Sequence, residues 1–111
     1  MPRAGAAARL LESAPVFAAL GDRTRLRIVA RLAEQSGVST TGLTSGTRVT
    51  RQAVSKHLAA LAEAGLVRSR RSGRERLWEL QADRLARAGR DLEQISRQWD
   101  EALARLRKLV E

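Results

Sequence analysis

The sequence predicts a mainly helical fold with one small β-hairpin, and three observations support this. Apolar residues recur at helical spacing in five segments, two strand-like runs flank a glycine within residues 66–80, and residues 83–111 carry apolar residues seven apart. The predicted order is helix–helix–helix–helix–strand–strand–helix. At 111 residues and 43% hydrophobic, the chain is long enough for one small domain and not for two.

The first two helices are predicted from apolar spacing and from their breaks. Residues 1–8 are expected to be frayed, within a partly flexible N-terminal segment of residues 1–13. The first helix is then marked by Leu10, Leu11, Val16, Phe17 and Leu20. We expect Asp22 to cap the second helix, over residues 23–35, and Gly37 to end it. The buried face of this second helix is predicted to hold Leu26, Ile28, Val29 and Leu32.

The next two helices form a predicted helix-turn-helix pair. Residues 39–46 are rich in Ser, Thr and Gly, which disfavour helix interiors, so we expect one or two turns held by Val38 and Leu43. A turn at residues 47–49 follows. Thr50 suits the N-cap of the next helix and Gly65 its C-terminal end. The apolar stripe of this helix is predicted to be Val54, Leu58 and Leu61.

The opposite face of the helix over residues 50–64 is polar and basic, which suggests contact with nucleic acid. Arg51, Gln52, Ser55 and Lys56 gather there, and such side chains can read base edges in a major groove. The whole chain has 21 Lys+Arg against 12 Asp+Glu, a net charge of +9. This excess favours a polyanionic partner, with a merely basic soluble protein as the alternative.

The predicted hairpin pairs residues 66–71 with residues 74–80 around a turn at Ser72-Gly73. A hairpin beside a recognition helix is a wing, and residues 14–82 then form a winged helix-turn-helix. Its arginines can reach phosphates or a minor groove. They are Arg68, Arg70, Arg71, Arg74 and Arg76. An ordinary solvated hairpin is the alternative, and Trp78 is expected to pack against the helices.

Residues 83–111 are predicted to form a long dimerisation helix. Two heptad series run along it, Leu85, Leu92, Trp99 and Leu106, and Ala88, Ile95, Ala102 and Leu109. The monomer core is too small to cover such a stripe, so we expect a homodimer through the N- and C-terminal helices. The interface is predicted to hold Leu10, Phe17, Leu85, Leu92, Ile95, Trp99, Leu103 and Leu106. Packing within the monomer is the alternative, and Trp99 is a core residue more often than part of an effector cleft.

Several classes of function are disfavoured. There is no cysteine, and His57 is the only histidine, so we expect no catalytic site, no metal site and no cofactor. We expect His57 to be structural or to face the DNA backbone. No apolar run approaches the ~20 residues that span a bilayer, and no secretory signal is evident. The protein is therefore expected to be cytoplasmic, with no membrane partner and with any small-molecule effector unknown.

Three stretches together resemble the ArsR/SmtB family of winged-helix transcriptional regulators, and the resemblance covers residues 14–111. They are Phe17-Ala18-Ala19-Leu20-Gly21-Asp22-Arg23-Thr24-Arg25-Leu26-Arg27-Ile28, then Val54-Ser55-Lys56-His57-Leu58 with Leu61 and Ala64-Gly65-Leu66-Val67, and Arg71-Ser72-Gly73-Arg74-Glu75. Residues 50–58, with Trp99-Asp100-Glu101, are similar to the metal-independent branch. The resemblance implies a homodimer that binds an imperfect palindrome and usually represses its own operon.

The chain departs from the metal-sensing members of that family. The expected third helix holds no cysteine, and the last helix has acids but no histidine. We interpret these acids as a solvated face beside arginines. They are Asp91, Glu93, Asp100 and Glu101. Residue 48 is Arg, where the family's turn often has glycine.

The leading hypothesis is a repressor that binds double-stranded DNA sequence-specifically. The side chains expected to contact base edges are Arg51, Gln52, Ser55 and Lys56. The residues expected to hold the DNA backbone are Thr40, Thr41, Arg48, Thr50, Arg70, Arg71 and Arg74. The alternative is a nonspecific or architectural nucleic-acid-binding protein, or an interaction module built on the same fold.

Overall fold

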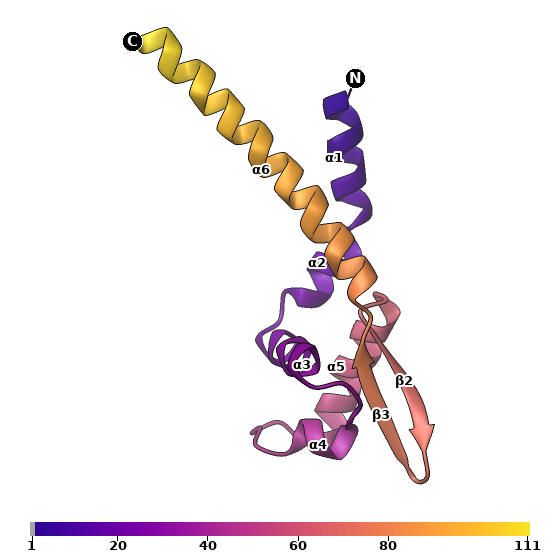
Figure 1. The fold of residues 1–111 in the computed structure, drawn as a ribbon. Helices are drawn as coiled ribbons and strands as arrows, with labels where there is room; N and C mark the ends of the chain where they lie inside the picture. The colour runs from indigo at the N-terminus through magenta and orange to yellow at the C-terminus, as the bar shows by residue number, and fades with distance from the viewer. Residues whose placement is uncertain (1) are drawn as a thin grey trace.

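A computed structural model describes the backbone of residues 2–111 and the side chains of residues 5–111. The lower body in Figure 1 holds four helices and a small sheet, and a long terminal helix projects from it beside the first helix. In chain order the elements are α1 (Pro2–Glu12), α2 (Ala14–Leu20), α3 (Arg23–Glu34), β1 (Val38–Ser39), α4 (Thr40–Thr44), α5 (Arg51–Glu63), β2 (Val67–Ser72), β3 (Glu75–Leu80) and α6 (Ala82–Val110). This order confirms the predicted mainly helical fold with a hairpin, and it adds one helix and one strand.

The additional helix is α1, which occupies residues where a frayed end was expected. It contacts α6, and Figure 1 shows the two helices coming together near the C-terminal end of α1 and diverging from there. Arg9 Nη2 donates to Gln94 Oε1 at 3.2 Å, and Arg87 Nη2 donates to Glu12 Oε2 at 2.8 Å. Residues 1–8 were expected to be frayed, whereas the structure includes residues 2–8 in this helix and leaves residue 1 outside the described residues. The contacts of α1 with α6 join positions 75 to 85 apart in sequence.

Helix α3 begins at the predicted cap and buries most of its predicted face. Asp22 Oδ1 accepts a hydrogen bond from the backbone N–H of Arg25 at 3.0 Å, which satisfies a free donor of the first turn. Ile28, Val29 and Leu32 are buried in the core. Leu26 is not, since it is 50% exposed. Two residues before Ile28 on a 3.6-residue helix, Leu26 points about 200° away from it and falls at the rim.

Both ends of α5 are set by the predicted residues. Thr50 Oγ1 accepts from the backbone N–H of Ala53 at 3.1 Å and caps the first turn. At the other end Gly65 has φ of 78°, and the N–H of Leu66 bonds the carbonyl of Leu61 at 2.9 Å. This is a Schellman ending, which glycine adopts without the strain that a Cβ would bring. The inner face of α5 is completely buried, with Val54, Leu58 and Leu61 each 0% exposed.

The sheet has three antiparallel strands in the order β1-β3-β2. Strand β1 is too short for a periodic pattern and exists because Val38 pairs with Trp78 of β3. Ser72 pairs with Glu75, so the hairpin turn is Gly73-Arg74 and not the expected Ser72-Gly73. Gly73 has φ of 62°, and a turn of type II′ places its glycine at the first central position. This one-residue shift changes which arginines face each other.

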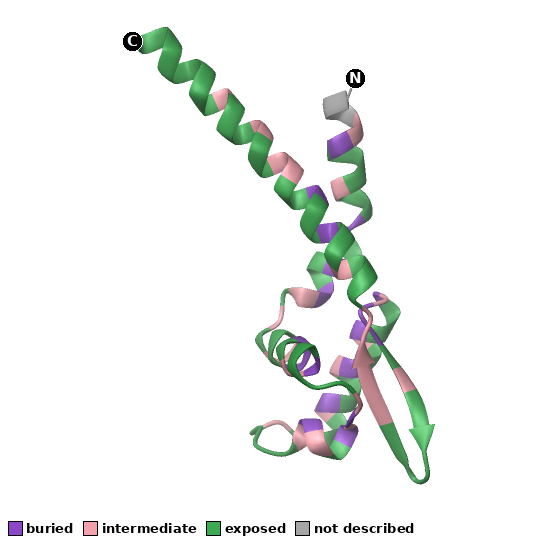
Figure 2. Cartoon of the chain, viewed as in Figure 1, coloured by how far each residue is buried: buried purple, intermediate pink, exposed green. Residues whose placement is uncertain are grey.

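Helix α6 is in contact with the body only along its first third. Leu85 packs on the monomer core, and Ala88 is 1% exposed. Beyond these the helix is largely exposed, as Figure 2 shows by the green outer half. Asp91 differs from the predicted solvated face because it is only 7% exposed and lies on the side of α6 that α1 covers. Within residues 2–111, no helix is long and apolar enough to cross a membrane.

Candidate nucleic-acid interface

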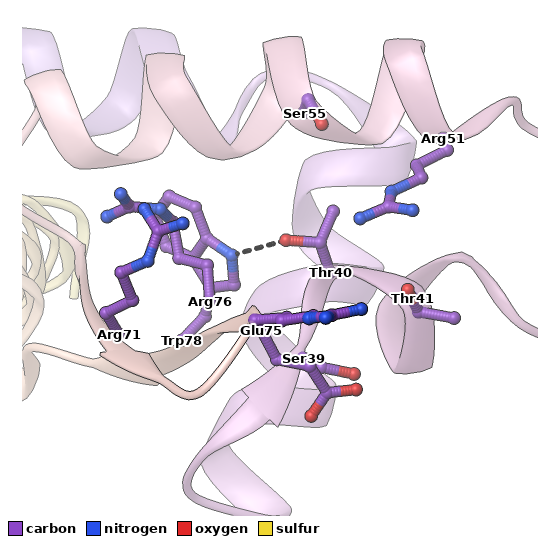
Figure 3. Close-up of a pocket in the computed structure, with 10 residues that line it drawn as sticks. Ser39, Thr40, Thr41, Arg51, Ser55, Arg71, Glu75, Arg76 and Trp78 are labelled. Carbon is purple, nitrogen blue, oxygen red and sulfur yellow. Dashed lines mark hydrogen bonds between the residues drawn. The ribbon is translucent and has the colours of Figure 1, made fainter.

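A groove of about 480 Å³ opens between α5, α4 and the tip of the hairpin. Figure 3 shows side chains from these three elements turning toward it. We call it the arginine groove, and its lining is Ser39, Thr40, Thr41, Arg51, Ser55, Arg71, Arg74, Glu75, Arg76 and Trp78. Four guanidinium groups against one carboxylate in this lining make the groove strongly cationic. Such a concentration of guanidiniums favours a phosphate-bearing partner.

Helix α5 provides one wall of the groove. Because the Thr50 cap starts the helix at Arg51, Arg51 and Ser55 fall one turn apart on the side that lines the groove. Gln52 and Lys56 are one position further round the helix and are exposed. All four predicted base-reading residues therefore lie on the exposed surface of α5.

The hairpin provides the opposite wall. Arg71 of β2 pairs directly with Arg76 of β3, and Arg74 sits in the turn. Like charges directly opposite each other in an antiparallel ladder destabilise it. The hairpin is anchored by Trp78, whose Nε1 donates to Thr40 Oγ1 of α4 at 2.9 Å (Figure 3). The anchor confirms that Trp78 packs against the helices, and it positions the wing relative to the helix-turn-helix.

Two of the predicted backbone-contacting residues are not free at the groove surface, because the Thr40 hydroxyl is already engaged and Arg70 lies outside the lining. Thr40 is 9% exposed and its hydroxyl accepts from Trp78, so it supports the site from below. Arg70 lies in register with Leu77 on the other face of the hairpin, with its guanidinium next to Gly37. Arg68 is on that face too, in an ion pair with Glu79.

Other residues predicted to contact the DNA backbone are exposed, and the groove lining includes one arginine that was not among them. Thr41, Arg48 and Thr50 are exposed around the N-terminus of α5. Arg76 lines the groove, although it was not among the expected contacts. The sequence signal for Arg76 was the turn glycine, because placing Gly73 first in the turn puts Arg76, and not Arg74, opposite Arg71.

The turn before α5 also has its left-handed glycine at Gly46, where φ is 79°, and not at residue 48.

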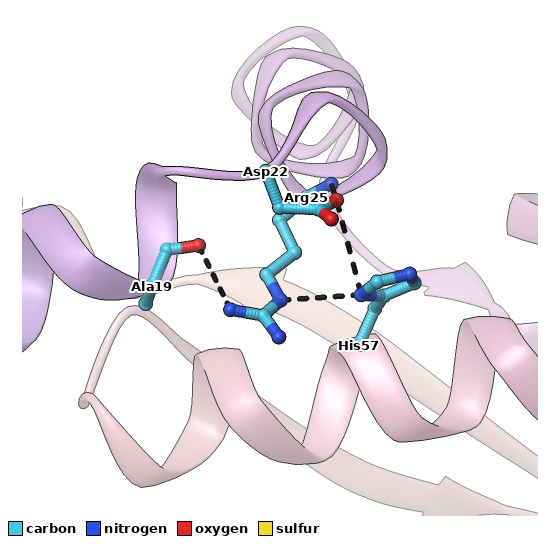
Figure 4. Close-up of polar contacts among 4 residues, drawn as sticks. All are labelled: Ala19, Asp22, Arg25 and His57. Carbon is cyan, nitrogen blue, oxygen red and sulfur yellow. Dashed lines mark hydrogen bonds and ion pairs between the residues drawn. The ribbon is translucent and has the colours of Figure 1, made fainter.

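His57 lies on the inner side of α5 and joins three helices (Figure 4). Its Nδ1 accepts from Nε of Arg25 at 3.1 Å, and Arg25 Nη1 donates to the carbonyl of Ala19 at 3.4 Å. Asp22 Oδ1 is 4.0 Å from His57 Nδ1. The hydrogen bond from the Arg25 backbone N–H lowers the pKa of Asp22. The prediction of a structural histidine is confirmed, and the contact fixes α5 against α2 and α3.

The predicted dimer residues lie mainly on the outer part of α6. Four are exposed there, from 48% to 65%: Leu92, Trp99, Leu103 and Leu106. Phe17 is 37% exposed, whereas Leu10 and Ile95 are half-buried. Leu85 differs, because it is half-buried against the monomer core. Within the described part of the chain, His, Asp and Glu form no cluster of three that could hold a metal ion.

Sequence comparison places this geometry among helix-turn-helix proteins. A helix-turn-helix domain family matches residues 20–70, which span α3, α4, α5 and the start of the wing. A relative in Bacillus subtilis (strain 168), described as the uncharacterized HTH-type transcriptional regulator YuzN, is 41% identical over 68 residues. That match covers 56% of this chain and 74% of the relative.

Solved structures extend the similarity to nearly the whole chain. An ArsR-like transcriptional regulator from Rhodococcus sp. RHA1 is 39% identical with a TM-score of 0.78, over 96% of this chain and 97% of that one. The homodimeric winged helix-turn-helix domain Mb0332 from Mycobacterium bovis, described as a possible ArsR-family regulator, is 28% identical with a TM-score of 0.62. It covers 86% of each chain.

Proposed function

Because the chain belongs to the ArsR family of winged helix-turn-helix transcriptional regulators, we propose that it acts as a homodimeric repressor that binds a palindromic operator and acts at its own promoter. The observation that carries the proposal is the arginine groove beside the exposed polar face of α5. Base-reading and phosphate-binding side chains meet there on one surface, as a sequence-specific DNA contact requires.

In this proposal α5 lies in a major groove. The guanidinium of Arg51 donates to O6 and N7 of a guanine, and Gln52 pairs with N6 and N7 of an adenine. Ser55 and Lys56 contact neighbouring base edges or phosphate. The backbone is held by Thr41, Arg48, Thr50, Arg71, Arg74 and Arg76, whereas Thr40 and Arg70 are left out because of where they lie.

The homodimer is supported by the apolar stripe on α6. Side chains as large as Trp99 and Leu106 are 65% and 57% exposed in the single chain, and a second copy would cover them. The Mycobacterium bovis relative is described as homodimeric, which supports the same assembly here. A two-fold dimer would present two copies of α5 to successive major grooves, with half-site centres about 34 Å apart.

The palindrome and the repression follow from that assembly. Two identical recognition helices related by a two-fold axis read the same half-site on opposite strands, so the operator has two-fold symmetry. A dimer bound across promoter DNA would exclude polymerase from the same stretch. The proposal places one such operator upstream of the protein's own gene.

A direct binding titration tests the proposal. Labelled DNA from upstream of the protein's own gene is titrated with the full chain, beside a scrambled duplex of equal composition, at two salt concentrations. We expect the native fragment to bind about 10³-fold more tightly. Equal, steeply salt-dependent binding to both duplexes would overturn the proposal and favour the nonspecific architectural function.

A further inference from the structure

A second pocket, of about 80 Å³, lies on the other side of the helix-turn-helix, beneath the turn between α4 and α5. Helix α3 contributes Thr24, Arg27, Ile28 and Arg31, which share one helical face. Its other walls come from Leu43 of α4, from Thr47 and Val49 of the turn and from Val54 of α5. None of these residues lines the arginine groove, so the two sites are separate.

The chemistry of this pocket combines an apolar floor with a cationic rim. Ile28, Leu43 and Val54 are buried and form the floor. Arg27 is exposed at the rim, and no hydrogen bond or ion pair engages its guanidinium within residues 5–111. Arg31 donates from Nη1 to the carbonyl of Gly42 at 2.7 Å. The lining contains no carboxylate to balance the two guanidiniums.

We propose that this pocket binds a short aliphatic monocarboxylate, whose carboxylate lies between Arg27 and Arg31. A planar carboxylate matches the guanidinium fork and leaves the ligand's alkyl chain to the floor. An engineered apolar cavity of 150 Å³ holds benzene, or about 25 Å³ per carbon, so the present volume accommodates about three carbons. Butyrate has that chain length.

The pocket is placed so that its occupant would alter the DNA-binding surface. The Arg31–Gly42 bond holds α4 against α3. A carboxylate accepts more strongly than a neutral carbonyl, so the ligand would compete with the Gly42 carbonyl for the Nη1 donor of Arg31. Helix α4 and the turn that leads into α5 would then loosen, which weakens DNA binding. This regulatory consequence rests on the proposed function, whereas binding of the ligand itself does not.

The binding site is tested on the full chain in solution, without DNA. Butyrate is titrated into the protein while backbone amide shifts are followed by NMR. We expect saturable shifts centred on Thr24, Gly42, Thr47 and Val49. Arg27→Gln should weaken binding about tenfold or more, because it removes a charge-assisted hydrogen bond. Shifts centred on α6, or none that saturate, would overturn the proposal.

Matched controls separate the carboxylate site from general attraction of anions. Arg23→Gln removes the same charge from α3 one turn earlier, outside the lining, and should leave butyrate affinity within about twofold. Butyramide keeps the chain but not the charge, and inorganic phosphate keeps a charge but not the chain. Both should bind at least about tenfold more weakly than butyrate. Equal binding of phosphate, or equal weakening by Arg23→Gln, would overturn the assignment.

The coupling to DNA has its own measurement. Butyrate affinity is compared for the free protein and for its complex with DNA. Thermodynamic linkage requires that DNA weakens butyrate binding by the same factor by which butyrate weakens DNA binding. Equal butyrate affinity in both states would overturn the regulatory consequence while leaving the site intact. Failure of the protein to bind any DNA would contradict the proposed function and leave the butyrate titration of the free protein as the test of the site.

Discussion

Arg71 and Arg76 face each other directly across the β2–β3 ladder, on the side of the hairpin that lines the arginine groove. Without a bound anion, the repulsion between these two guanidiniums destabilises the hairpin. A phosphate placed between them would attract both guanidiniums. The wing therefore carries a local instability that an anionic partner relieves, and folding stability and DNA affinity should respond to this pair in opposite directions.

Arg71→Gln should therefore stabilise the free protein and weaken its DNA complex. Removing one of the like charges should raise the free energy of unfolding by up to about 1 kcal/mol. Loss of a phosphate contact should weaken all DNA sequences similarly and reduce the slope of log affinity against log salt by about 1. Urea unfolding and salt-dependent fluorescence anisotropy measure the two effects.

The matched control is Arg68→Gln, on the opposite face of the same strand. Arg68 is paired with Glu79, so this change should not stabilise the protein and should leave the salt slope unchanged. An Arg71→Gln variant that lost stability, or that bound DNA normally, would contradict the role given to the pair.

Arg51→Ala should affect specificity more than general affinity. The guanidinium is exposed at the first turn of α5 and is proposed to pair with one guanine, so its loss should cost about 1–3 kcal/mol on the native site. Competition with duplexes substituted at single positions should show relaxed preference at one base pair. Wild-type affinity and preference in the variant would remove Arg51 from base reading.

Local signals predicted the helix ends well, because each depends on residues close together in sequence. Thr50 and Gly65 mark the two ends of α5, and both are residue types that the sequence alone identifies as favoured at helix ends. Asp22 does the same for α3. The exposed polar face of α5 could also be predicted, because the cap fixes where the helix begins and residues one turn apart then share a side.

Features that depend on distant residues could not be predicted in this way. Strand β1 forms only because Val38 meets Trp78, and Thr40 is buried by the same tryptophan. Helix α1 contacts α6, which is distant in sequence. A one-residue choice of turn decides that Arg76, and not Arg74, lies opposite Arg71 in the ladder.

Gly65→Ala should destabilise the protein for two separable reasons. A left-handed φ of 78° costs a residue with a Cβ about 1–2 kcal/mol, and the new Cβ would lie 2.7 Å from Cδ of Arg84. Chemical unfolding should show the sum of both costs. Adding Arg84→Ala should restore the steric part, after correction for the Arg84→Ala change alone, and leave the backbone strain. If the double variant recovered the full stability, backbone strain at residue 65 would be contradicted. If it recovered none, the clash with Arg84 would be contradicted.

Asp91→Asn should raise stability at neutral pH. The carboxylate is 7% exposed, and among the described residues its Oδ2 has no hydrogen-bond partner to offset the cost of burying it. Removing the charge should add about 1 kcal/mol or more to the free energy of unfolding at fixed protein concentration. Asp100→Asn, at an exposed position of the same helix, should change it by less than about 0.5 kcal/mol. A loss of stability at Asp91 would contradict the view that its buried carboxylate is destabilising.

The proposal that two copies of α5 occupy successive major grooves is tested most directly by a hydroxyl-radical footprint on DNA from upstream of the protein's own gene. We expect two protected regions with two-fold symmetry and centres about one helical turn, or 34 Å, apart. Protection should be lost at the same protein concentration with Arg51→Ala. A single protected region, or uniform protection along the fragment, would contradict the dimeric, sequence-specific account.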